Sequence, residues 1–437
     1  MGVVHFNIIN RQGKIRAREG ALAMAIALMA HSDKDGRRRS TVPRRRNSFG
    51  TDWRYVLLFA ALLIPFFEPT GFIRGVVPEV AGLFKVWRVA TVAALVCLCI
   101  RHGSKDAFSL IAIAITALMF LSTLINEGAG RTWIYVQCFY DWAPLLVSVL
   151  LVNYAYRDRM TELLWAILIV TGVLSICNTI SVLGWPQGVV TGTREPSNFY
   201  GHKNASIDLA LPSVGCSLLL DAQRGRRCSA RSVALFAIGL VQCIVSYSAT
   251  SVVALALFPV LFVAVQFRKT RPAVNGFSCF GAYVVAAVLP MGVKIQELFA
   301  PIIVGVLGKT VTFTLRTFVW DGVFSLMTPD HLLLGYGASV RFGLFFNDFL
   351  YNNAHNFFLH VLVSGGLAGV VLYGILILLA MRTLYQGRHD FASAVLTVVV
   401  ACFFVIGLME SLITISWPLM LALAYYWDAG RTSAIRV

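Results

Sequence analysis

Long apolar runs, separated by short polar segments, recur along the chain from residue 55 to residue 427. A helix needs roughly 17–25 predominantly apolar residues to cross a bilayer. Segments of about this length lie at 55–73, 79–100, 107–125, 134–153, 162–182, 205–220, 232–248, 250–267, 276–293, 356–381, 391–409 and 412–427. The pattern therefore predicts an all-α polytopic membrane protein of about twelve transmembrane helices.

The composition favours the same class. The chain is 58% hydrophobic and only 13% charged, whereas a soluble domain has about 25% charged residues. An earlier apolar stretch, 21–30, is too short to span a bilayer and has no small-residue cleavage site beside it. We therefore expect no cleavable signal peptide.

The lysine and arginine residues predict the orientation of the helices. If the N-terminus is cytoplasmic, 27 of the 37 basic residues fall on its side of the membrane. Positive charge in short flanking segments marks the cytoplasmic side. We expect residues 1–54 to be a disordered basic cytoplasmic tail and 428–437 to be a second cytoplasmic tail. The tail lacks interleaved aromatic residues or a folded module, so the net charge of +16 does not indicate nucleic-acid binding.

This topology divides the rest of the chain into three parts. Residues 55–293 form the first nine spans and include an outer loop at 184–204, residues 294–354 form a large outer loop, and residues 355–427 form the last three spans. The large loop is far longer than a simple connector, and loops of this length are usually functional. It is half apolar, so we expect it to carry short interfacial helices.

Ten basic residues remain on the outer side, where topology does not require them. They are Arg74, Lys85, Arg88, Arg131, Arg194, Lys203, Lys294, Lys309, Arg316 and Arg341. The guanidinium group of arginine binds phosphate through paired hydrogen bonds. Histidine titrates near neutral pH and can accept a proton from an attacking hydroxyl group. Arginine with His355 therefore suits chemistry on a lipid diphosphate, although each residue also fits a solvated loop or a helix cap.

No metal site is predicted. The nine cysteines show no spacing typical of zinc ligands or of a disulfide framework. His355 and His360 are five residues apart, which on a helix turns their side chains away from each other. Zinc-binding helices favour spacings of three or four with a carboxylate nearby.

Three segments resemble the O-antigen ligase and polysaccharide polymerase family. In the first, His355-Asn356 is followed after nine residues by Gly366 and after two more by Gly369. In the second, Arg194 precedes the sequence FYGHKN at 199–204, and the third is TLRTFVW at 314–320 with a later GYG. The similarity extends from about 184 to 381. Two departures are Ala249, where many relatives have arginine, and TLRT, where TGRT is more common.

The resemblance implies a metal-independent, inverting glycosyltransferase of the large membrane (GT-C-like) class that needs no cofactor. It implies that Arg194 and Arg316 bind the diphosphate of an undecaprenyl-diphosphate-linked sugar and that His355 activates the acceptor hydroxyl. Arg341 competes with Arg316 for its role. The possible accessory residues are His202, Lys203, Asn204, Arg341 and Asn356. Gly366 and Gly369 are expected to let a neighbouring helix approach closely.

The predicted function is polymerisation of lipid-linked repeat units into exopolysaccharide or O-antigen at the periplasmic face of a bacterial inner membrane. The expected partners are the lipid-linked oligosaccharide, the growing polysaccharide, a chain-length regulator and a flippase. One alternative is an O-antigen ligase that transfers polysaccharide to lipid A-core. A second is a lipid-linked oligosaccharide transporter, although transporters tend to have paired repeats and ligands at mid-membrane.

Overall fold

The structure is a computed structural model. It describes residues 51–103, 105–127, 132–190, 197–293, 316–337, 345–346, 349–350 and 353–433. Residues 1–50 of the predicted basic tail, 1–54, therefore lie outside the described residues, whereas Trp53 and Arg54 at its end are already part of a helix. The described residues belong to one unit, Thr51–Val437.

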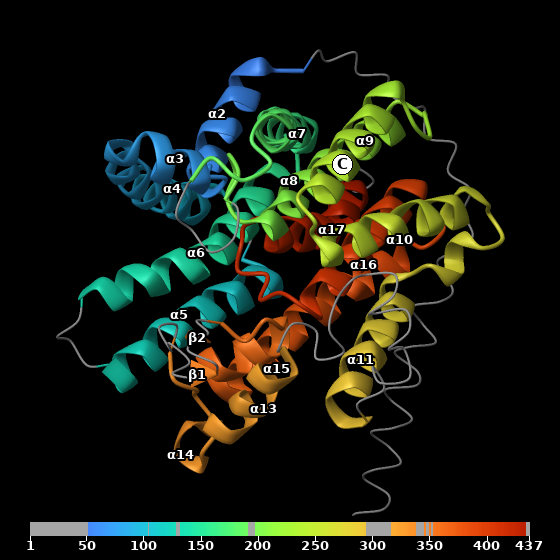
Figure 1. Ribbon diagram of the computed structural model, residues 1–437. Helices are drawn as coiled ribbons and strands as arrows, with labels where there is room; N and C mark the ends of the chain where they lie inside the picture. Colours follow the sequence, from blue (N-terminus) through green and yellow to red (C-terminus); the bar gives the residue numbers. More distant parts are fainter. Residues whose placement is uncertain are drawn as a thin grey trace, which may run out of the picture. The chain divides into compact units, whose positions relative to one another are not determined.

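The described residues are mainly α-helical, which confirms the predicted fold class (Figure 1). The first six α-helices are α2 (Trp53–Leu63), α3 (Thr70–Val76), α4 (Ala81–His102), α5 (Ala107–Glu127), α6 (Thr132–Ala155) and α7 (Met160–Gly184). The next four are α8 (Ser206–Gln223), α9 (Ala230–Val245), α10 (Ala249–Gln266) and α11 (Gly276–Val293). The last five are α13 (Arg316–Leu326), α14 (Pro329–Leu332), α15 (Phe357–Gln386), α16 (Phe391–Gly407) and α17 (Ser416–Ser433).

Four short 3-10 helices connect these elements. They are η1 (Ile64–Phe66), η2 (Pro78–Val80), η3 (Lys203–Ala205) and η4 (Arg271–Ala273). The described part of the large loop also contains a two-stranded antiparallel hairpin, β1 (Phe345–Phe346) and β2 (Phe349–Leu350). The sequence pattern did not predict this hairpin. The described part of the same loop also contains the short helices α13 and α14, and a location of these helices at the membrane interface stays a prediction.

Each of the twelve predicted apolar segments contains a helix. Among the described residues, seven helices are long and apolar enough to cross a membrane, or eight if the bent pair α2–α3 forms one span. The shorter apolar helices are 230–245, 276–288 and 391–407. The membrane class is thus confirmed, whereas a total of twelve spans stays a prediction.

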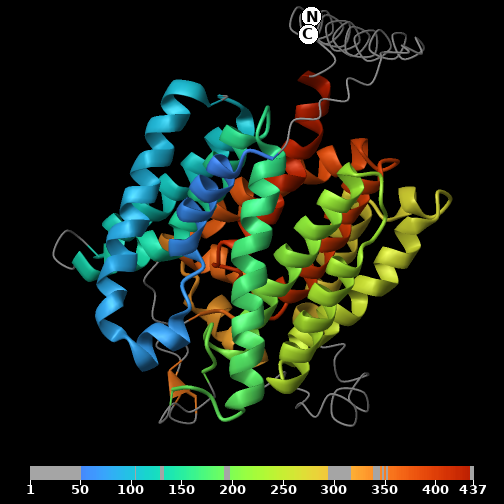
Figure 2. The ribbon, with the colours of Figure 1, turned by 90° about the horizontal axis from the view of Figure 1, so that it is seen from above.

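The helices differ in how deeply they are buried (Figure 2). In the segment that contains α8, 89% of the most apolar window is buried inside the protein, compared with 11% for the segment that contains α4. Most residues of α16 are buried as well. Helices α8 and α16 therefore form the centre of the bundle, and α4 exposes apolar side chains on its surface, as a lipid-facing helix does.

The first predicted span, 55–73, is bent by 65° between its two helices. Pro65 begins the break, because proline lacks the N–H group that a continuing helix would use. Arg88 on α4 stabilises the bend: its Nε donates to the Pro65 carbonyl at 2.6 Å and its Nη2 pairs with Glu68 at 2.6 Å.

The tenth predicted span, 356–381, lies almost entirely within α15, which is not a single straight helix. Gly366 has φ 61° and ψ −162°, which breaks α15 into two halves. The ring centroids of Phe357 and Tyr373, on opposite sides of the break, are only 4.9 Å apart. A Cβ atom placed on Gly369 would lie 3.5 Å from Val361. Because residues 16 apart in a straight helix are about 24 Å apart, α15 is a helical hairpin that turns at Gly366.

The segment Leu333–Gly337 fills the break. Tyr336 N donates to Val363 O at 2.7 Å, and Gly337 N donates to Ser364 O at 3.0 Å. Ala368 N in turn donates to Leu333 O at 3.1 Å. Backbone groups released by a broken helix need such partners inside a membrane protein. The large loop thus takes part in holding the hairpin that begins just after His355.

Candidate functional site

Three side chains from distant parts of the chain lie around the carboxylate of Glu410. Glu410 lies in the turn between α16 and α17. Arg316 Nη2 and Asn204 Nδ2 both donate to Glu410 Oε1, each at 2.7 Å. His355 Nδ1 lies 3.7 Å from the other oxygen, Oε2. That distance is too long for a hydrogen bond, and the pair becomes an ion pair only when the imidazole is protonated.

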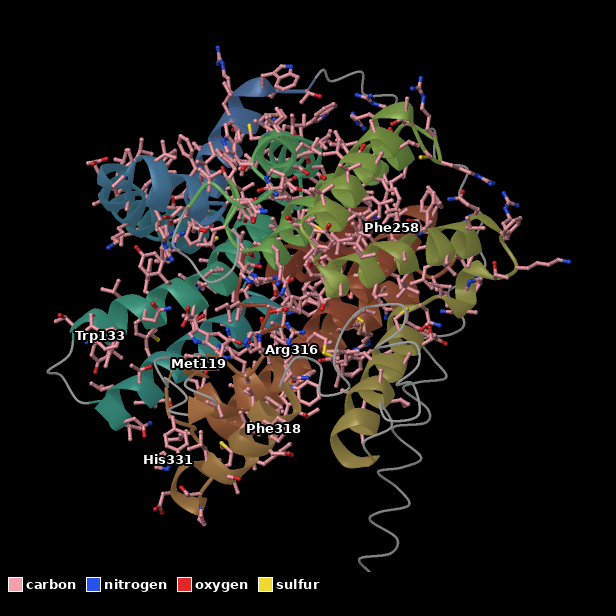
Figure 3. All side chains as sticks on the ribbon, viewed as in Figure 1. Met119, Trp133, Phe258, Arg316, Phe318 and His331 are labelled. Carbon is pink, nitrogen blue, oxygen red and sulfur yellow. The ribbon has the colours of Figure 1, made fainter. Side chains whose placement is uncertain are left out.

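These residues come from distant parts of the chain. Arg316 is the first residue of α13 (Figure 3), Asn204 lies in η3, and His355 precedes α15. The charged side chains of the site are largely shielded from solvent, with 16% of Arg316, 21% of Glu410 and 27% of His355 exposed. In such surroundings charge–charge attraction is stronger than in bulk water.

The backbone at His355 adopts a conformation that is uncommon for residues with a side chain. His355 has φ 46°, in the left-handed region that few residues other than glycine occupy. Its N–H group donates to Asn353 Oδ1 at 2.9 Å, and Ser411 Oγ donates to the same oxygen at 3.2 Å. Asn353 therefore connects the backbone of His355 to the turn that contains Glu410.

Asn356 fixes the start of α15. Its side-chain oxygen accepts a hydrogen bond from Leu359 N at 3.1 Å, which makes it the N-cap. Its Nδ2 donates to Leu408 O at 3.2 Å. Asn356 therefore joins the start of α15 to the end of α16, on the other side of His355 from Asn353.

The loop after α7 brings Asn204 to the cluster. Phe199 packs against Phe72 of α3 with ring centroids 5.3 Å apart, and Phe72 N donates to Phe199 O at 2.9 Å. Asn204 Oδ1 accepts from Ser248 Oγ at 2.8 Å, which orients the amide so that its Nδ2 faces Glu410. The neighbouring residues His202 and Lys203 lie at the N-cap and first position of η3.

The charge on Glu410 is stabilised by its neighbours. Burial alone would raise the pKa of this carboxyl group, but the nearby His355 side chain and the charges of Arg316, His355 and His202 lower it below its ordinary value. Glu410 is therefore an anion at neutral pH. The positive end of the α15 helix dipole lies beside His355 and adds to the attraction for anions at this position.

The cluster lies at the ends of short helices. α8, α16 and α17 have 17 or 18 residues, whereas α7 has 25. At 1.5 Å per residue the short helices extend about 26 Å and α7 about 37 Å.

The structure brings together some of the predicted site residues and leaves others outside its description. Arg316, His355 and Asn204 meet at Glu410, and Asn356 anchors the helix that begins beside them. Arg194 and Arg341 lie outside the described residues. The catalytic and binding roles of all the predicted site residues stay predictions.

The two glycines of the motif have different surroundings. A Cβ atom on Gly369 would lie 3.3 Å from Met119 Cε of α5, a close helix–helix approach (Figure 3 labels Met119). A Cβ atom on Gly366 would lie 2.3 Å from backbone atoms of Leu333. Gly366 is thus needed for the turn of the hairpin and for the approach of the large loop, and not for a neighbouring helix as expected.

Sequence reasoning missed Glu410. The signal was present, because Glu410 is the single charged residue between Asp390 and Asp428. A lone ionisable residue between apolar segments points to a functional site by default. The contacts of Glu410 with Asn204 and Arg316 become visible only in the folded structure, because these residues are far apart in the sequence.

His360 lies in the first turn of α15, five residues after His355. It is 5% exposed, and its ring stacks on Trp142 with centroids 6.3 Å apart. Neither ring nitrogen has a hydrogen-bond partner among the described residues. Within that part of the chain, no group of three or more His, Cys, Asp or Glu side chains could hold a metal ion.

One comparison with known proteins indicates the family of this chain. Residues 234–374 match the family model described as O-antigen ligase. The matched region includes Arg316 and His355 and two of the three segments that carry the resemblance. It supports the O-antigen ligase and polymerase family and, in general terms, a function of that type. A comparison with curated proteins gave no match.

Proposed function

We propose that this protein is a glycosyltransferase that polymerises lipid-diphosphate-linked oligosaccharide units at the periplasmic face of a bacterial inner membrane. The observation that carries the proposal is the convergence of the Arg316 guanidinium group and the His355 imidazole on one carboxylate. In this proposal Arg316 supplies the cation for a leaving diphosphate and His355 the base for a hydroxyl group, and both residues lie within the region that matches the O-antigen ligase family model.

In the proposed reaction, an acceptor hydroxyl attacks the anomeric carbon of the donor sugar. His355 takes the hydroxyl proton as the new C–O bond forms. Nδ1 faces Glu410, so Nε2 is the nitrogen that accepts this proton. The bond from the anomeric carbon to the diphosphate oxygen breaks, and Arg316 with Arg194 stabilises the anionic leaving group. A single displacement inverts the anomeric centre.

The donor class is undecaprenyl-diphosphate-linked oligosaccharide, and the other substrate is the growing polysaccharide. We propose that His202, Lys203 and Arg341 supply further polar contacts and that no metal or other cofactor is needed. A chain-length regulator and a flippase are the proposed protein partners, since repeat units made in the cytoplasm must cross the membrane first.

The experiment that tests this function uses purified protein in detergent, lipid-linked repeat units and lipid A-core as a second possible acceptor, with and without a chelator. We expect polymer with inverted linkages to form. Detergent solution has no compartments, so a transporter would give no covalent product. Product on lipid A-core alone would favour the ligase alternative. Absence of any glycosidic product, or its loss on adding the chelator, would contradict the proposal.

A further inference from the structure

We propose that Glu410 is a positioning residue that couples binding of the donor diphosphate to activation of His355. In the absence of donor, Glu410 holds Arg316. When the diphosphate takes Arg316, Glu410 is released to hydrogen-bond and orient His355. This inference rests on the proposed function and adds a residue and a sequence of contacts to it.

The contacts of Glu410 are unequal at its two oxygens. Oε1 accepts two hydrogen bonds of 2.7 Å, from Arg316 and from Asn204. Oε2 has His355 Nδ1 at 3.7 Å. A movement of about 0.7 Å would bring this pair into hydrogen-bond range. The carboxylate is therefore held by Arg316 on one side and lies close to the imidazole on the other.

A diphosphate is a stronger partner for Arg316 than a carboxylate is. It has more negative charge, and a guanidinium group can bind it through two parallel hydrogen bonds. Arg316 has five N–H donors, and its side chain is 16% exposed. The remaining donors can therefore meet an anion that enters from the accessible edge.

When the diphosphate binds Arg316, Glu410 loses the cation that pairs with it but remains largely buried. A buried charge without a partner is costly, so it will move toward the nearest group that can compensate it. His355 Nδ1 is that group. A hydrogen bond from Nδ1–H to Oε2 fixes the tautomer in which Nε2 carries no proton and can accept the hydroxyl proton, and it stabilises the imidazolium that results. Glu410 itself takes no proton.

A second ion pair in the same protein provides a matched control. Arg88 and Glu68 pair at 2.6 Å with 13% and 15% of their side chains exposed. Their burial and geometry are similar to those of Arg316 and Glu410. This pair stabilises the bend between α2 and α3. Glu68→Gln therefore removes one charge of a comparable pair without changing the candidate site.

The test measures kcat and donor KM with lipid-linked repeat units, and separately the affinity for undecaprenyl diphosphate as a probe. For Glu410→Gln we expect kcat to fall by about 10²- to 10⁴-fold. We expect this variant to bind the probe at least as tightly as wild type does. Arg316→Gln should weaken probe binding instead. Glu68→Gln should retain kcat within a few-fold.

If Glu410→Gln weakens probe binding as much as Arg316→Gln does and leaves kcat unchanged, Glu410 only holds Arg316 in place and the inference is wrong. If Glu410→Gln does not fold, Glu410→Asp keeps the charge but shortens its reach, and the same split between kcat and probe binding is expected. Full activity of His355→Gln would overturn the proposed function itself. An inactive His355→Gln with a fully active Glu410→Gln would overturn only the present inference.

Discussion

Phe357 and Tyr373 pack edge to face with ring centroids 4.9 Å apart, although they are sixteen residues apart in the sequence. This contact requires α15 to reverse direction between them. His355, two residues before Phe357, is therefore held at the start of a short half-helix that packs against the rest of α15. The backbone of His355 is held by Asn353, which accepts its N–H, and the next residue, Asn356, is anchored to Leu408.

The turn at Gly366 should tolerate no side chain. For Gly366→Ala we expect a large loss of stability, because its φ of 61° alone costs an alanine about 1–2 kcal/mol and the new Cβ would collide with the backbone of Leu333. The unfolding midpoint in detergent measures this. Gly374→Ala, in the same helix with open space around its Cβ, should change the midpoint little. Equal midpoints for the two variants would show that the hairpin turn is not required.

Arg316 should be irreplaceable for catalysis. Removal of a charge that stabilises the leaving diphosphate should lower the rate of Arg316→Ala by about 10²–10³-fold. Arg316→Lys should recover only part of this, since an ammonium group cannot form the paired hydrogen bonds of a guanidinium. Polymer formation at equal amounts of membrane-embedded protein gives the comparison. Wild-type rates for Arg316→Ala would transfer the role to Arg341.

The stability of the protein should depend on pH through Glu410. Its pKa is lower in the folded protein than the ordinary value of 4.5, so the folded state favours the anion. This contribution to stability is fully present above about pH 4.5 and is lost as the pH falls through the lower, folded-state value. We expect the unfolding midpoint of wild type to fall more than that of Glu410→Gln between pH 6 and pH 3. A parallel fall in both proteins would contradict the assignment.

The topology can be checked by labelling single cysteines in a cysteine-free background. Residues 184–204 and 294–354 should react with a membrane-impermeant reagent from the periplasm, whereas 221–231 and 382–390 should not. The positive-inside distribution of lysine and arginine is the reason. A cytoplasmic location of Lys203 would contradict the proposed mechanism, because Asn204 beside it contacts Glu410.

The helices could be predicted from the sequence because long apolar runs of this kind are typical of transmembrane helices. The motif that contains His355 was predicted because it resembles that of the O-antigen ligase and polysaccharide polymerase family. The sequence did not predict the hairpin in α15, because both halves of that segment are equally apolar and only the conformation of Gly366 separates them.

The role of Glu410 also could not be predicted from local patterns. Its hydrogen-bond partners Asn204 and Arg316 are 206 and 94 residues away in the chain. No periodicity or short motif relates residues at such distances. A site formed by long-range contacts becomes visible only in the folded structure.

The most direct test of the account is the rate of polymer formation by His355→Gln. Glutamine keeps the size and hydrogen-bonding capacity of the side chain but cannot accept the hydroxyl proton as a base. His389→Gln, which changes an exposed histidine between α15 and α16, is the control and should be as active as wild type. We expect His355→Gln to bind undecaprenyl diphosphate normally but to polymerise about 10²–10⁴-fold more slowly. Polymerisation by His355→Gln at the wild-type rate would contradict the proposed role of His355.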